Sequence, residues 1–288
     1  MNITRSILII PLAGLLLIGC ATHQQSEYAA FAQAGSKYSH AIDNVLVAAG
    51  QAQVDNTSWR LVEFNRKFPV SDEEYQKQTN VDLERLTVIR DLRSHAQELA
   101  KYFGQLNSLA TSDAPERTST SIDGVVNNLN VLSSTLRTST PEAFSSLTPL
   151  AEIVVEGRIR KVLREELEKR KDIIREELRV QEVILNFLKK DIAHLLALSK
   201  DLKERTLVLE PLQTGSPLAQ PEEWVKKRRK VMYLQEQVEE LSAAQNLAGN
   251  MSKTFNALLS GNKDAVTKIN ILLDDIENIL KVADTIKS

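Results

Sequence analysis

Histidines and paired acidic residues are the side chains of this chain that could do chemistry, as metal ligands or as general acids and bases. The four histidines form no His-x-x-x-His or His-Glu-x-x-His pattern, the spacing that places two imidazoles on one face of a helix. None has an acidic partner at a recognisable spacing, so we expect them at the surface or at the edge of the core. They are His23, His40, His95 and His194.

Adjacent acidic residues occur in several segments whose composition predicts helix. Side chains of adjacent helical residues point about 100° apart, so these pairs do not converge on one site. The chain also has no phosphate-binding loop, no Gly-x-Gly-x-x-Gly and no Gly-x-Ser-x-Gly motif. The sequence therefore predicts a protein that is not an enzyme, with no metal, no cofactor and no small-molecule substrate. The pairs include Glu165–Glu166, Glu176–Glu177, Glu239–Glu240 and Asp274–Asp275.

Cys20 is the only cysteine, which excludes both an intramolecular disulfide and a cysteine cluster for zinc. It follows a segment with Arg5 near its start and an apolar run from Ile7 to Ile18. That run is shorter than the roughly 20 residues needed to cross a bilayer. A charged start, a short apolar run and a polar continuation are typical of a secretory signal peptide, here residues 1–19.

The end of this segment, Leu17-Ile18-Gly19-Cys20, resembles the lipobox of bacterial lipoproteins. The resemblance covers residues 1–20 only, and the mature chain resembles no family known to us. In lipoproteins a signal peptidase recognises the residues before the cysteine, here Leu17, Ile18 and Gly19, and cuts before it. The resemblance implies that the thiol of Cys20 receives diacylglycerol and that its new amino group is acylated.

Lipid on Cys20 implies stable membrane attachment, because two or more acyl chains hold a protein far longer than one does. Ala21 follows the cysteine. An aspartate at that position would hold such a lipoprotein in the inner membrane of a Gram-negative cell. The resemblance therefore implies an outer-membrane protein that faces the periplasm of a Gram-negative source.

Five consecutive basic residues, Lys226-Lys227-Arg228-Arg229-Lys230, are the sharpest charge feature of the chain. On a helix they surround the axis, so most of them must face solvent. They lie close to a predicted turn, where Glu222 and Glu223 offset part of their charge. Two interpretations stay open. The run is either a solvated helix end or a contact for an anionic surface, such as lipid headgroups, cell-wall polymer or an acidic protein.

Composition favours helices over sheets, because Leu, Ala and Glu are the commonest residues and aromatic residues make up only 5%. The formal net charge is −2, and removal of residues 1–19 takes away Arg5 and leaves −3. A dedicated nucleic-acid binder should be clearly basic, so this balance argues against nucleic acid as a partner.

Apolar residues recur at three- and four-residue spacing in several segments, which predicts helices. The longest would extend roughly 80 Å, with steps of three, four and seven residues as in coiled coils. Ser71 with Glu74 forms a capping-box pattern, Gly261 is a C-cap signal, and residues 55–58 allow a break in the first helix. The predicted helices are 37–66, 72–110, 121–137, 150–208, 222–260 and 263–286.

The last long pair is joined by a predicted turn over residues 210–220, which makes its helices antiparallel neighbours. Trp224 beside this turn is expected to plug the hairpin end. The sequence thus predicts an all-α fold, an elongated antiparallel helical bundle with a long coiled-coil-like hairpin. The expected organisation is a signal peptide (1–19), a flexible tether (20–36), an N-terminal helical region (37–140) and the hairpin with a C-terminal helix (141–288), packed as one bundle.

Three functions are consistent with these features. The favoured one is a membrane-anchored periplasmic spacer, scaffold or adaptor for a protein partner in the envelope. The second is a membrane-acting helical protein of the pore-forming or curvature-binding type, although the mature chain lacks the concealed apolar segment that such proteins usually have. The third is an enzyme without a recognisable motif. Self-association stays open, because a heptad-like stripe can also pair with its own copy.

Overall fold

The fold is all-helical throughout the part of the chain that the structure, a computed structural model, describes: residues 18–287 except 112–114, 140–161, 214, 216 and 263. The predicted all-α fold is therefore confirmed. The helices are α1 (Ile18–Asn65), α2 (Asp72–Thr111), α3 (Pro115–Ser139), α5 (Val162–Lys169), α6 (Lys171–Lys203), the π-helical η1 (Glu204–Leu209), α7 (Glu210–Gln213), α8 (Pro221–Leu259) and α9 (Ala265–Lys287).

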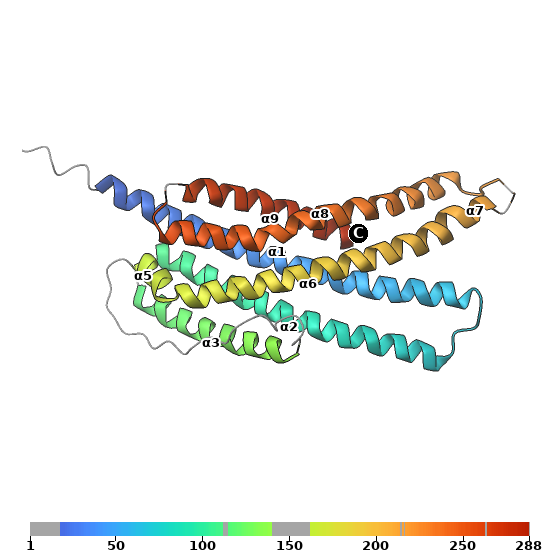
Figure 1. Cartoon of the computed structure of the whole chain (residues 1–288), viewed down its shortest axis with the longest axis horizontal. Helices are drawn as coiled ribbons and strands as arrows, with labels where there is room; N and C mark the ends of the chain where they lie inside the picture. The colour runs from blue at the N-terminus through green and yellow to red at the C-terminus, as the bar shows by residue number, and fades with distance from the viewer. Residues whose placement is uncertain are drawn as a thin grey trace, which may run out of the picture.

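Two long antiparallel hairpins form the bundle (Figure 1). One consists of α1 and α2, and the other consists of α6 and α8 joined through η1 and α7. The shorter helices α3 and α9 pack along α2 and along α1 with α8, respectively. The molecule is elongated, and the α7 end of the second hairpin lies at the opposite end from the start of α1 (Figure 1).

Helix α1 is the central helix, in contact with α2, α9, α6 and α8. Its buried face includes Tyr28, Phe31, Ala32 and Ala34. The prediction of a flexible tether over residues 20–36 is therefore wrong, because α1 begins at Ile18 and the later part of this segment belongs to the core. Small polar residues suggested a linker, but alanine is a strong helix former and its small side chain allows helices to approach.

An aromatic cluster forms the core near the start of α1. The ring of Phe31 stacks on Phe255 of α8 with centroids 5.6 Å apart, and it meets Phe103 of α2 edge-on at 5.8 Å. Gly35 makes this packing fit, since a Cβ atom there would lie 2.4 Å from the Phe103 ring. The glycine that suggested the end of a tether is therefore required by close packing between α1 and α2.

Other boundaries differ from the predictions in detail. Helix α1 has no break at residues 55–58, because Asn56 and Thr57 are buried and bond to neighbouring helices. The gap between the predicted helices 72–110 and 121–137 is shorter, since α2 ends at Thr111 and α3 begins at Pro115, a residue suited to the first helical turn. The predicted 150–208 helix is interrupted at Arg170 between α5 and α6, and its first part lies outside the described residues.

Candidate functional site

The turn of the second hairpin places the basic run at the end of the molecule. Helix α6 widens into η1 just before Pro211, whose ring would collide with the carbonyl four residues earlier in an α-helix. Gly215 has a φ of 73° in the turn, and Pro221 begins α8 at a position that needs no backbone N–H. Lys226–Lys230 consequently lie within the first turns of α8.

All five residues of the basic run have exposed side chains. Lys226 pairs with Glu223, with Nζ and Oε1 2.7 Å apart, and this hydrogen bond and charge lower the pKa of Glu223. Lys227, Arg228 and Arg229 form no ion pair with another described residue. Across the hairpin, Lys203 of α6 is half-buried, and its pKa is lowered by burial and by the charge of Lys230. The run therefore extends a basic area that continues onto α6.

Two tryptophans hold this end of the bundle together. The indole Nε1 of Trp224 donates a hydrogen bond to the carbonyl of Val208 at 3.1 Å, which ties α8 to η1. Trp224 thus closes the hairpin end, as the sequence predicted. The ammonium of Lys203 lies over the ring of Trp59 at 5.8 Å, a cation–π contact between α6 and α1.

Glu63 links the two hairpin ends by ion pairs. Its carboxylate contacts Arg205 of η1 at 3.0 Å and Lys67 at 3.3 Å, while neighbouring Arg66 pairs with Glu210 of α7. Burial alone would raise the pKa of Glu63, but the hydrogen bond from Lys67 and the nearby positive charges outweigh it and lower that pKa. The end of α1 and the tip of the second hairpin therefore form one surface, here called the distal end.

Large apolar side chains are exposed at the distal end. They come from the end of α1, the turn to α2, the start of α2, and the η1–α8 tip. Contiguous exposed apolar residues mark contact sites more often than scattered ones do. The residues are Val62, Phe64, Phe68, Tyr75, Leu209, Leu212 and Val225.

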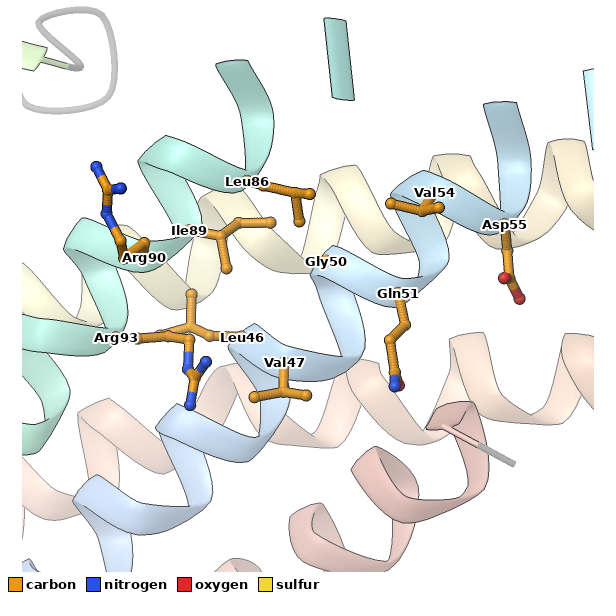
Figure 2. A pocket seen from close by; sticks show the side chains of 10 residues that line it. All are labelled: Leu46, Val47, Gly50, Gln51, Val54, Asp55, Leu86, Ile89, Arg90 and Arg93. Carbon is orange, nitrogen blue, oxygen red and sulfur yellow. The ribbon is translucent and has the colours of Figure 1, made fainter. Parts of the chain in front are cut away.

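A groove between α1 and α2 has a volume of about 490 Å³ (Figure 2). Leu86 and Ile89 reach from α2 towards Gly50 of α1, where the missing side chain opens the floor (Figure 2). Arg93 on its rim is held by Asp43, with Nε and Oδ1 2.7 Å apart. Gln51, Asp55 and Arg90 also line the groove, and its apolar floor can accept an apolar side chain.

A buried polar cluster lies between α2, α3 and α6, and sequence reasoning missed it. His95 Nε2 lies 2.6 Å from Glu177 Oε2 and 2.9 Å from Ser133 Oγ, while the Gln181 amide lies 2.6 Å from Nδ1. The expectation that His95 is a surface or core-edge residue without an acidic partner is wrong, because it is fully buried beside Glu177.

Serine, histidine and glutamate are the side chains of a hydrolase triad, but this arrangement does not fit one. Glu177 and Ser133 share the same imidazole nitrogen, and the Ser133 hydroxyl donates to Glu177 at 2.9 Å. A nucleophile must also be open to substrate, whereas all three residues are buried. The cluster instead joins three helices by hydrogen bonds between buried side chains, with Gln181 Oε1 left without a partner.

The lipobox residues are only partly within the described structure. Leu17 lies outside the described residues, whereas Ile18, Gly19 and Cys20 form the first turn of α1. The structure therefore places Cys20 and the basic run at opposite ends of the molecule and does not bring them together (Figure 1).

The described helices include none long and apolar enough to cross a bilayer. Nor do the described residues group three or more histidine, cysteine, aspartate or glutamate side chains in a way that could hold a metal ion. Comparison of the chain with protein-family models, with curated proteins and with solved structures gives no match.

Proposed function

We propose that this chain is a bacterial lipoprotein that is held in a membrane by lipid on Cys20 and acts as a rigid helical spacer or scaffold. Its task is to hold the distal end away from that membrane, for contact with a partner in the envelope. The membrane is the outer membrane of a Gram-negative cell, since Ala21 rather than aspartate follows the cysteine.

The observation that carries this proposal is the continuity of α1. The helix begins at Ile18, passes Cys20 and continues without a break to Asn65. A helix of this length spans roughly 70 Å. The first of its side chains described as buried, Tyr28, comes only eight residues after Cys20. A lipid on Cys20 would therefore connect to the bundle through a short helical segment. This supports a rigid spacer rather than a domain attached by a flexible linker.

The partner is proposed to be a protein or another envelope surface that meets the distal end. Charge and exposed apolar side chains gather there. A second copy of the chain is the alternative occupant. Analytical ultracentrifugation of the detergent-solubilised protein distinguishes them, since self-association would shift the sedimentation with protein concentration.

Replacement of Cys20 tests the anchor. In cells, Cys20→Ser should leave the precursor uncut and remove the acyl mass that intact-mass spectrometry finds on the wild-type protein. A control variant, Ala21→Ser, keeps the cysteine and should remain acylated and cut, while Ala21→Asp should move the protein to the inner membrane. If Cys20→Ser is still cut and still co-fractionates with membranes, the anchor proposal fails.

A distance measurement tests the spacer. The acylated protein is placed in neutral phosphatidylcholine vesicles, with a donor dye at Gln213 in one sample and at Lys37 in the other, and an acceptor dye in the lipid. Energy transfer should be strong from Lys37 and weak from Gln213, because Gln213 lies in α7 at the far end. Equal transfer from both positions would mean that the bundle lies flat on the membrane.

A further inference from the structure

The tip of the α6–α8 hairpin combines an uncharged end with exposed apolar side chains. Residues 211–221 contain no charged side chain, in a chain where charged residues make up 26%. Leu212 lies within this segment with 52% of its surface exposed. Leu209 at 46% and Val225 at 45% lie just beyond the acidic residues that flank it, Glu210, Glu222 and Glu223. An uncharged, apolar end can enter the headgroup region of a bilayer without the cost of removing a charge from water.

A collar of basic residues surrounds the hairpin directly behind this tip. Residues 200–230 contain eight basic and five acidic side chains, which leaves three net positive charges on a chain whose total is negative. The five residues of the basic run surround the axis of α8 and are all exposed. Long lysine and arginine side chains can keep their charged ends at phosphate groups while the apolar residues ahead of them insert.

We propose that the tip of the α6–α8 hairpin binds an anionic membrane surface, with Leu209, Leu212 and Val225 inserted between headgroups and Lys227, Arg228 and Arg229 in contact with lipid phosphates. A protein partner usually meets one face of a helix. The basic run instead presents charge in every direction around α8, which suits a surface whose headgroups surround an inserted tip. A soluble or cell-wall polyanion would meet the charges but gives no reason for the apolar end.

Acidic groups near the tip limit which side of the distal end makes this contact. Glu223 is neutralised by Lys226, and Glu222 is the remaining acidic residue of the first turn of α8. The first turn of α2 carries Asp72, Glu73 and Glu74. An anionic surface repels these three acidic residues of α2. The proposed contact is therefore made by the α7–α8 side of the distal end and does not include the turn between α1 and α2.

The position of the tip gives this binding a consequence for the whole molecule. The tip lies at the other end of the bundle from Cys20 (Figure 1). A chain held at Cys20 in one membrane would reach a second membrane with its tip and connect the two. This consequence rests on the proposed function, whereas lipid binding by the tip does not depend on Cys20.

Vesicle sedimentation tests the binding without the anchor. The chain without residues 1–20, which lacks Cys20 and the apolar run Ile7–Ile18 but keeps every described buried side chain, is mixed with vesicles of phosphatidylcholine alone or of equal parts phosphatidylcholine and phosphatidylglycerol. Reversal of Lys227, Arg228 and Arg229 to glutamate should lower the partition onto the anionic vesicles at least about 100-fold, since loss of each basic residue near such a surface costs about fivefold and the new glutamates add repulsion. Raised salt should weaken wild-type binding as well.

The matched control reverses three exposed lysines that lie away from the tip, Lys37, Lys190 and Lys253, to glutamate. This control changes the net charge by the same amount and should keep most of the binding. Equal losses in both triple variants would mean that net charge alone drives the binding, and the assignment to the tip would be overturned. Circular dichroism should show the same helix content for all variants, because every altered side chain is exposed.

A second pair of variants tests insertion. Leu212→Asp should reduce binding to the anionic vesicles at least fivefold, while Val131→Asp on α3, where the side chain is 65% exposed, should not. If Leu212→Asp binds like the wild type, the tip does not insert and the proposal is wrong. Binding to soluble polyglutamate but not to vesicles would assign the basic run to an acidic macromolecule and overturn the lipid proposal. Neither result bears on acylation of Cys20.

Discussion

The two ends of this bundle are built differently. Near the start of α1, Phe31, Phe103 and Phe255 pack together without exposure to solvent, and a glycine allows the helices to approach closely. At the distal end, Phe64 and Phe68 contact each other, yet both remain exposed. The same residue type is therefore used for core packing at one end and presented to the surroundings at the other.

This difference separates what holds the fold from what is available for contact. Burial of apolar surface supplies most of the favourable free energy of folding. The end of the bundle near the start of α1, here called the proximal end, should therefore carry much of the stability. The distal end is held mainly by ion pairs around Glu63 and by the hydrogen bond of Trp224. Exposed ion pairs contribute little. Changes at the distal end should therefore alter contacts while leaving the fold intact.

The largest expected effect comes from truncating matched phenylalanines at the two ends. Phe103→Ala should lower the free energy of unfolding by about 3–5 kcal/mol, because it removes a fully buried ring and leaves a cavity. Phe68→Ala, at a side chain that is 60% exposed, should change it by less than about 0.5 kcal/mol. Urea denaturation followed by circular dichroism measures both. Similar losses of unfolding free energy for the two variants would mean that the two ends do not differ in how much they stabilise the fold.

Local sequence signals predicted the helices well because they act over a few residues. Ser71 accepts a hydrogen bond from the Glu74 backbone N–H at 3.2 Å, as expected for the N-cap of α2. Gly261 has a φ of 66° directly after α8, the left-handed conformation expected of a C-cap. Gly215 lies in the hairpin turn predicted over residues 210–220, although α7 extends the helix through Pro211 to Gln213. Each of these residues acts on its own neighbours, so no knowledge of packing was needed.

Contacts between distant helices were not predictable in the same way. His95 and Glu177 are 82 residues apart, and nothing local to either residue indicates that they meet. The predicted tether failed for a similar reason, since Gly35 looks like a break until Phe103 of α2 is placed against it. The basic run was visible in the sequence, but its position opposite Cys20 required the three-dimensional arrangement.

Disruption of the buried polar cluster should produce the next largest effect. It tests whether buried hydrogen bonds also contribute to the stability of the proximal end. Glu177→Ala removes the partner of both His95 and Ser133, so we expect a loss of about 3 kcal/mol in the free energy of unfolding. Glu182→Ala, at an exposed position of the same helix, serves as the control and should cost less than about 0.5 kcal/mol. Equal values from urea denaturation would show that the cluster is energetically unimportant.

The smallest expected effect is a pH dependence at the distal end. The pKa of Glu63 is lowered in the folded protein by Lys67, Arg205 and Arg66, which outweigh burial. A carboxyl group with a lowered folded pKa stabilises the protein above its unfolded pKa, and that contribution is lost as the pH falls through the folded value.

The difference in the free energy of unfolding between wild type and Glu63→Gln should therefore be present at neutral pH and shrink in acid, below the ordinary glutamate pKa of about 4.3. Urea denaturation at a series of pH values measures this difference, and Arg205→Gln should reduce it, since one of the lowering charges is removed. Added salt should weaken it too, because the ion pairs are partly exposed. A difference that stays constant into acid would mean that these ion pairs do not stabilise the fold, and that the two hairpin ends are held together by the packing of Trp59 and Trp224 instead.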